Sequence, residues 1–133
     1  MSQPAPGFKF KRVMVVDDAS IDRFLVERIV KKTSFAEEVL SFESAKDALE
    51  GLSQTADTAP QVIFLDINMP GMNGFEFLTE FEKFPDSFKQ DCSVVMLTSS
   101  LHPDDKLKAA HNPRIKCFLN KPLKPEYLIN LEL

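Results

Sequence analysis

The chain has 133 residues, a length typical of one domain that buries about two-thirds of its unfolded surface without disulfides or metal staples. Hydrophobic residues make up 44% and charged residues 27%, which excludes a disordered, collagen-like or disulfide-scaffold chain. The formal net charge of -4 argues against nucleic acid as a direct partner, because phosphate binding requires a basic face. We find neither a signal-peptide stretch nor an apolar run long enough to span a membrane, so we expect a cytoplasmic protein without membrane attachment.

Short apolar runs at residues 13–16, 62–65 and 94–97 predict strands. These runs lack polar alternation, which is typical of strands buried on both faces of a parallel sheet. Residues 39–42 and 115–119 are two weaker strand candidates.

Helical patterns lie between the strands. The first has an apolar stripe at i, i+3, i+4 and i+8, which we expect to face the core: Ile21, Phe24, Leu25 and Ile29. A second helix is predicted after the cap residue Ser44, a third over residues 74–84, a fourth near Pro103 and a fifth over 126–133.

The predicted order is a strand followed by a helix, five times. This alternation specifies a doubly wound α/β fold with a parallel sheet and right-handed crossovers. We expect residues 1–10 to form a flexible arm and residues 11–133 to form the single domain.

Polar residues follow four of the predicted strands. They are Asp17 and Asp18, Asp66, Thr98, and Lys121. Ligands of open parallel sheets bind beyond the carboxyl ends of the strands, so we expect these side chains to converge there. Three carboxylates in one crevice repel each other unless a cation lies among them, and oxygen ligands without a His or Cys cluster favour Mg²⁺ over zinc.

This combination of groups is suited to phosphoryl transfer. Asp66 ends the central apolar strand and is the best candidate for a nucleophile that forms an acyl phosphate. A metal ion and Lys121 would neutralise the phosphoryl group, and Thr98 would donate a hydrogen bond to one of its oxygens.

Four separated motifs carry a family resemblance: Val-Val-Asp17-Asp18, Leu65-Asp66-Ile-Asn68-Met-Pro70-Gly-Met-Asn-Gly74, Val-Met-Leu-Thr98-Ser and Phe118-Leu-Asn-Lys121-Pro122. Over about residues 11–131 the chain resembles the receiver domain of bacterial two-component response regulators, of the CheY-like, stand-alone kind. The resemblance implies a flavodoxin-like, five-stranded parallel sheet of order 2-1-3-4-5 with helices on both faces.

The resemblance also implies a phosphoacceptor and a Mg²⁺ site. Asp66 matches the phosphoacceptor. Asp18 matches the acid that binds Mg²⁺ directly, Asp17 acts through water, Asn68 offers its backbone carbonyl, and Asp66 completes the metal set.

Further positions match the family's switch. Thr98 corresponds to the switch hydroxyl, Lys121 to the cation that pairs with the acceptor, and Phe118 to the switch aromatic, although an aromatic residue in a strand is also typical of a core. Pro122 matches a proline that commonly follows a cis peptide bond, and Gly74 closes the glycine-rich turn beside the site.

Two features near the site bear on its tuning. Ser99 stands where the family prefers Ala or Gly, which suggests a slightly tighter phosphoryl pocket. Asn68 and Ser100 occupy positions that tune the lifetime of the phosphoryl group in relatives.

The leading functional hypothesis is a switch that receives a phosphoryl group from a histidine kinase or phosphotransfer protein and then changes its surface for a downstream protein. It would catalyse only its own modification and be monomeric when unphosphorylated. The basic cluster Arg23, Arg28, Lys31 and Lys32 is then either a solvated helix face or a contact for the kinase.

Two other functions remain open. One is a pseudo-receiver, a binding module that never takes a phosphoryl group, although such modules lack some of the acids, the hydroxyl or the lysine. The other is a Mg²⁺-dependent phosphatase of the haloacid-dehalogenase type. Those enzymes require Asp-x-Asp, whereas this chain has Asp66-Ile-Asn68.

Overall fold

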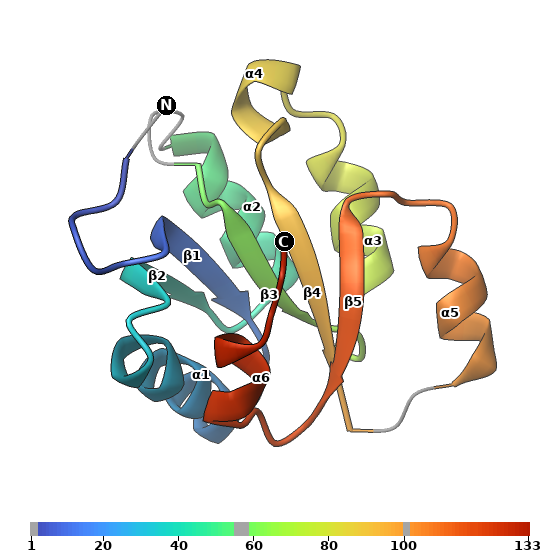
Figure 1. The fold of residues 1–133 in the computed structure, drawn as a ribbon. Coiled ribbons are helices and arrows are strands. Elements are labelled where there is room, and N and C mark those ends of the chain that lie inside the picture. Colours follow the sequence, from blue (N-terminus) through green and yellow to red (C-terminus); the bar gives the residue numbers. More distant parts are fainter. Residues whose placement is uncertain (1–2, 55–58, 100–101) are drawn as a thin grey trace.

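The fold is seen in a computed structural model that describes residues 3–54, 59–99 and 102–133. One sheet contains all strands of this described part, and every neighbouring pair is parallel. The strands are β1 (Phe10–Val16), β2 (Ala36–Phe42), β3 (Val62–Asp66), β4 (Ser93–Thr98) and β5 (Ile115–Asn120). Their spatial order is β2-β1-β3-β4-β5 (Figure 1), which confirms the predicted doubly wound sheet.

Helices cover both faces of this sheet (Figure 1). They are α1 (Ser20–Lys32), α2 (Ala45–Gln54), α3 (Gly74–Phe81), α4 (Asp86–Lys89), α5 (Pro103–Ala109) and α6 (Pro125–Ile129). The helices α1 and α6 pack on one face and α2 and α3 on the other, whereas α5 buries none of its residues.

The two faces have separate hydrophobic cores because successive strand residues point to opposite sides. Val13, Val15 and Phe64 face α1 and α6. Met14 and Leu65 face α2 and α3. All five residues of β3 are buried, which explains the unbroken apolar run that predicted this strand.

The predicted apolar stripe of α1 is wrong at its first two positions. Ile21 is 76% exposed and Phe24 is 59% exposed. The buried face instead consists of Val26, Ile29 and Val30. The chain enters α1 at the carboxyl edge of the sheet, where the first turn has no strand beneath it. The side chains of this helix are therefore buried only in its later turns.

Several helix ends also differ from the prediction. The third helix ends at Phe81 rather than at residue 84, and the separate short helix α4 follows Pro85. The last helix ends at Ile129. The cap at Ser44 is present, since its Oγ accepts a hydrogen bond from the Asp47 N–H at 3.1 Å.

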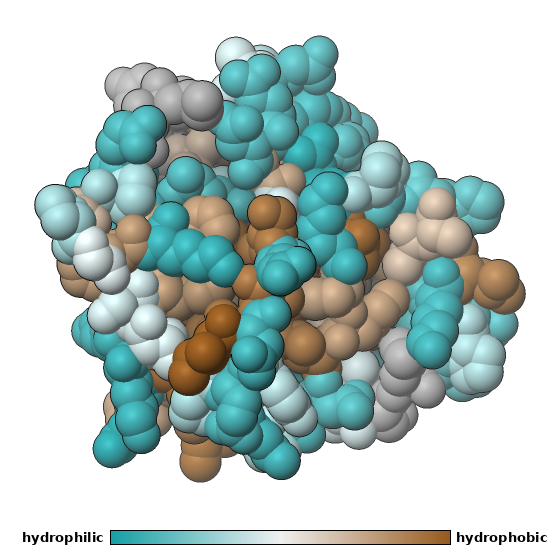
Figure 2. Space-filling model, in the orientation of Figure 1, coloured by the Kyte–Doolittle hydropathy of each residue, from teal (hydrophilic) through white to brown (hydrophobic). Residues whose placement is uncertain are grey.

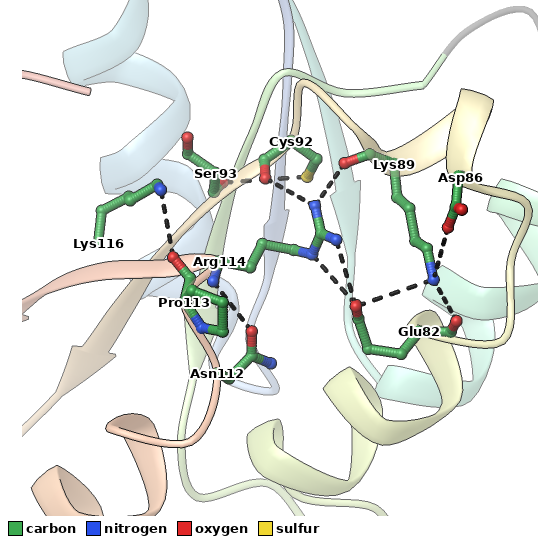
Figure 3. A network of polar contacts seen from close by, with 9 residues as sticks. All are labelled: Glu82, Asp86, Lys89, Cys92, Ser93, Asn112, Pro113, Arg114 and Lys116. Carbon is green, nitrogen blue, oxygen red and sulfur yellow. Dashed lines mark hydrogen bonds and ion pairs between the residues drawn. The ribbon is translucent and has the colours of Figure 1, made fainter.

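An Arg114-centred network fastens the amino edge of the sheet (Figure 3). The guanidinium makes two hydrogen bonds of 3.2 Å to the carboxylate of Glu82, just after α3. It also donates to the carbonyl oxygens of Lys89 and Cys92. Lys89 is buried and donates to the carbonyl of Glu82. The network therefore joins the end of α3, α4 and the starts of β4 and β5.

The surface is mainly hydrophilic in the view of Figure 2, with hydrophobic atoms gathered near the middle, where the C-terminal segment crosses in front of the sheet. That segment includes the exposed Ile129 and Leu133, whereas Leu128 and Leu131 are buried against the α1 face. Near the other end of the chain, the Ala5 N–H donates to Glu37 Oε1 at 2.7 Å.

Gly74 lets α3 begin directly against the end of β3. Its N–H donates to the carbonyl of Ile67 at 2.9 Å, and a Cβ at this position would stand 2.6 Å from the Asp66 carbonyl oxygen. A side chain here would push the helix away from the strand that carries Asp66.

We therefore expect Gly74→Ala to lower the free energy of unfolding by about 1–3 kcal/mol, the usual cost of overpacking a close contact. Urea unfolding followed by circular dichroism measures this loss. Thr79→Ala, at an exposed position of the same helix, is the matched control. A Gly74→Ala protein as stable as the control would contradict this account of the turn.

Candidate functional site

Three carboxylates meet at the carboxyl edge of the sheet. Asp17 directly follows β1, and Asp66 is the last residue of β3, the strand that pairs with β1. Together with Asp18 they offer oxygen atoms that all lie within 4.8 Å of one another. Asp17 and Asp66 are buried and Asp18 is exposed, so the cluster opens to solvent on the side of Asp18.

Lys121, which directly follows β5, extends its ammonium group to this cluster. Its Nζ lies 2.7 Å from Asp17 Oδ2 and 3.3 Å from Asp66 Oδ1. A third contact, of 3.1 Å, reaches Oδ2 of Asp22 in the first turn of α1. The backbone N–H of Lys121 donates to the Thr98 carbonyl at 2.8 Å, and the Lys121–Pro122 peptide bond is cis, as expected.

Burial and the charges of this cluster shift the pKa values of Asp66 and Lys121. Burial, and then the neighbouring charge of Asp17, raise the pKa of Asp66 from 3.8 to about 6. Lys121 and the Asn68 N–H oppose that shift only in part. Burial alone would lower the pKa of Lys121, but its contacts with Asp17, Asp66 and Asp22 outweigh this effect and raise it. The ammonium therefore stays charged, while ionisation of Asp66 costs free energy.

The donor set fits a hard divalent cation. Asp17 Oδ1 accepts a hydrogen bond from the Ala19 N–H at 2.9 Å. Its other carboxylate oxygen, Oδ2, is buried and forms the ion pair with Lys121 without an aligned hydrogen bond. Carboxylate oxygens with unused lone pairs, in a cluster of excess negative charge, are suited to Mg²⁺ or Mn²⁺.

The other predicted site residues surround the cluster at different depths. Thr98 is buried at the end of β4, and Asn68 is exposed. Phe118 on β5 is half-buried and packs against the core under α2 and α3. Ser99 directly follows β4, while Ser100 lies outside the described residues.

Sequence reasoning missed Asp22 of α1, and it did not predict the contact that Arg23 makes at the site. Asp22 contacts Lys121, and Arg23 donates from Nη1 to the Asp17 carbonyl at 2.7 Å rather than lying on a wholly solvated face. Both lie in the first turn of α1, directly after the Asp17–Asp18 pair. This nearness to the pair in the sequence could have indicated that they lie at the same edge of the sheet.

Comparison with known proteins assigns the family. The pattern described as "Response regulator receiver domain" matches residues 13–131. The chain belongs to the response regulator receiver domain family. Members of this family are mainly signalling switches of two-component systems.

Individual relatives agree with this assignment. Protein PilG of Pseudomonas aeruginosa is 32% identical over 129 residues, which cover 97% of this chain and 87% of PilG. A two-component response regulator from Cytophaga hutchinsonii has a crystal structure that matches with a TM-score of 0.83 at 35% identity, covering 92% of this chain and 93% of that one. A relative named response regulator Rcp1 comes from Synechocystis sp.. The crystal structure of the Mn²⁺-bound form of Rcp1 matches with a TM-score of 0.70 at 29% identity, and the match covers 89% of this chain and 86% of that one.

Some relatives are much longer than this receiver domain. The chain is 29% identical to the sensor histidine kinase CheAY of Helicobacter pylori over 118 residues, which are 87% of this chain but 14% of that protein. The receiver domain therefore also occurs joined to kinases. Among the helices of the described residues, none combines the length and the apolar character needed to cross a bilayer.

The raised pKa of Asp66 predicts a stability change in Asp66→Asn. A carboxyl group whose pKa is higher in the folded state destabilises the fold as the pH rises from about 4 through 6. In EDTA at pH 7.5, Asp66→Asn should therefore be more stable than the wild type by about 1–3 kcal/mol, and the gain should shrink towards pH 4. Urea unfolding at both pH values measures it.

Asp91→Asn, which removes an exposed acid after α4, controls for the change in net charge. Excess Mg²⁺ should stabilise the wild type more than Asp66→Asn. An Asp66→Asn protein less stable than the wild type in EDTA at pH 7.5 would contradict the proposed cost of the Asp66 charge.

Proposed function

We propose that this receiver domain accepts a phosphoryl group on Asp66 from a histidine kinase or a phosphotransfer protein. The observation that supports this most directly is the acidic cluster of Asp17, Asp18 and Asp66 with the ammonium of Lys121 against it, in a member of the response regulator family. The cluster brings together a carboxylate that can act as a nucleophile, further carboxylates that can bind a metal ion, and an ammonium group of opposite charge.

The proposed transfer is a displacement at phosphorus. A carboxylate oxygen of Asp66 forms the new P–O bond while the P–N bond of a phosphohistidine breaks, and its electron pair goes to the imidazole nitrogen, which can take a proton. Lys121 neutralises part of the phosphoryl charge, and the Thr98 hydroxyl donates a hydrogen bond to a phosphoryl oxygen. Water later cleaves the acyl phosphate, or a second histidine receives the group.

We propose Mg²⁺ as the cofactor of this transfer. Asp17, Asp18, Asp66 and the backbone carbonyl of Asn68 would hold it, and it would supply Lewis-acid neutralisation of phosphoryl oxygens. The Mn²⁺-bound structure of Rcp1, a relative with the same fold, supports a divalent metal in such a domain.

The proposed output uses Thr98 and Phe118. A phosphoryl group that draws the Thr98 hydroxyl towards it leaves room beside β5, where half-buried Phe118 can turn inward. This change alters the surface around α5 and β5 for a downstream protein. We propose that the domain is cytoplasmic and monomeric until it is phosphorylated.

Phosphorylation is directly testable by intact-mass measurement after incubation with phosphoramidate. We expect the wild type to gain one phosphoryl group in Mg²⁺ and not in EDTA, and Asp66→Asn to gain none. Asp91→Asn controls for loss of an acidic residue away from the cluster. Equal labelling of Asp66→Asn would disprove Asp66 as the acceptor, and steady hydrolysis of p-nitrophenyl phosphate would favour a phosphatase instead.

The exposed first turn of α1 supports a docking site for the phosphoryl donor. Ile21 and Phe24 are exposed beside the site. Further along the same helix, the basic residues Arg28, Lys31 and Lys32 are also exposed. Apolar residues exposed next to a reactive cluster are typical of a surface that a partner covers.

Phe24→Ser should therefore slow phosphotransfer from a protein donor about fivefold or more, the usual effect of truncating an interface anchor. The donor is the histidine kinase that phosphorylates the wild type fastest in a panel of purified kinases. Labelling by phosphoramidate should be unchanged, because this small donor needs no docking surface. Leu107→Ser, at a 66% exposed position on α5, is the matched control. Equal loss with both donors would refute the docking role.

A further inference from the structure

Asp22 contacts the ammonium of Lys121, although it belongs to none of the motifs by which the family is recognised. The contact joins Asp22 Oδ2 and Lys121 Nζ at 3.1 Å, across 99 residues of sequence. The Asp22 side chain is 28% exposed and that of Lys121 14%, so water screens this pair less than a surface ion pair.

Three carboxylates share the same ammonium group. A lysine ammonium has three N–H donors, and the facing oxygens belong to Asp17 at 2.7 Å, Asp22 at 3.1 Å and Asp66 at 3.3 Å. The two shorter contacts are to residues that carry no phosphoryl group. Lys121 is thus held towards the end of β1 and the start of α1.

A phosphoryl group on Asp66 changes what Lys121 must neutralise. It adds negative charge and presents new oxygen acceptors to the ammonium. Asp22 opposes this state in two ways, because it retains one N–H donor of Lys121 and because its own fixed charge repels the added charge.

We propose that Asp22 is a positioning residue that holds Lys121 towards α1 and weakens the affinity of the site for a phosphoryl group on Asp66. The inference rests on the proposed function. Asp22 would then adjust the affinity for the phosphoryl group from α1, in addition to the acids, the hydroxyl and the lysine that perform the transfer.

A second explanation for Asp22 is purely structural. An acidic residue in the first turn of a helix stabilises the positive end of its dipole. Asp47 occupies the same first-turn position in α2, on the helix that follows β2. Asp47→Asn therefore removes an equivalent helix-end charge without touching Lys121.

The test is a titration with beryllium trifluoride, a stable mimic of the phosphoryl group, in saturating Mg²⁺ and followed by NMR. Asp22→Asn should bind the probe about three- to tenfold more tightly than the wild type at low ionic strength, as expected for removal of one partly screened charge. The difference should shrink at high salt, because screening weakens the repulsion. Asp22→Glu should restore wild-type affinity within about twofold, since it returns the charge.

Asp47→Asn should bind like the wild type, and Asp22→Ser, which keeps a polar first-turn side chain, replaces Asp22→Asn if that variant does not fold. If Asp22→Asn and Asp22→Ser bind the probe no more tightly than the wild type, or if Asp47→Asn gains as much affinity as they do, the proposed role of Asp22 is wrong. The proposed function would stand in that case. Absence of probe binding by the wild type would overturn the proposed function and this inference with it.

Discussion

The ion pairs of Lys121 hold together a cluster of charges that the sheet could not otherwise bury. Asp17 directly follows β1 and Asp66 ends the neighbouring β3, and both side chains are buried. Burial, and then repulsion from Asp17, raise the pKa of Asp66, and Lys121 offsets this rise only in part. The backbone N–H of Lys121 donates to the Thr98 carbonyl at this edge, and the ammonium of the same residue faces both buried acids.

The two ends of the sheet use charge differently. At the amino edge, the donors of Arg114 meet the Glu82 carboxylate and the carbonyl oxygens of Lys89 and Cys92 in a network whose polar groups satisfy one another (Figure 3). At the carboxyl edge, one ammonium faces several carboxylates, and negative charge remains in excess. A satisfied network contributes rigidity, whereas an unbalanced one favours the arrival of a cation. The difference explains why, within the described residues, the carboxyl edge is the candidate for chemistry.

Much of the fold and of the cluster could be predicted from the sequence, because β1, β3 and β4 contain apolar runs, at residues 13–16, 62–65 and 94–97, that polar residues directly follow. The approach of Asp17, Asp18, Asp66 and Lys121 follows from parallel strands ending at one edge, whereas their roles in phosphoryl transfer stay predictions. The stripe through Ile21 and Phe24 was wrong because helical periodicity does not reveal where the sheet beneath a helix ends. The helix α4 has four residues, too few for a periodic pattern. Asp22 gains its significance only from a lysine 99 residues away, which local sequence cannot show.

The weak anchoring of α5 has a thermodynamic consequence. This helix is capped by His102 and Asp105, but it buries no side chain, and Lys108 lies over the Phe75 ring with Nζ 5.4 Å from its centroid. Local opening of a segment costs little free energy when few apolar contacts are lost. Opening of the α5 segment therefore costs less free energy than opening of α1, which buries Val26, Ile29 and Val30, while the Arg114 network joins the starts of β4 and β5. A small difference in free energy is therefore enough to displace α5, and such a displacement leaves the two hydrophobic cores intact.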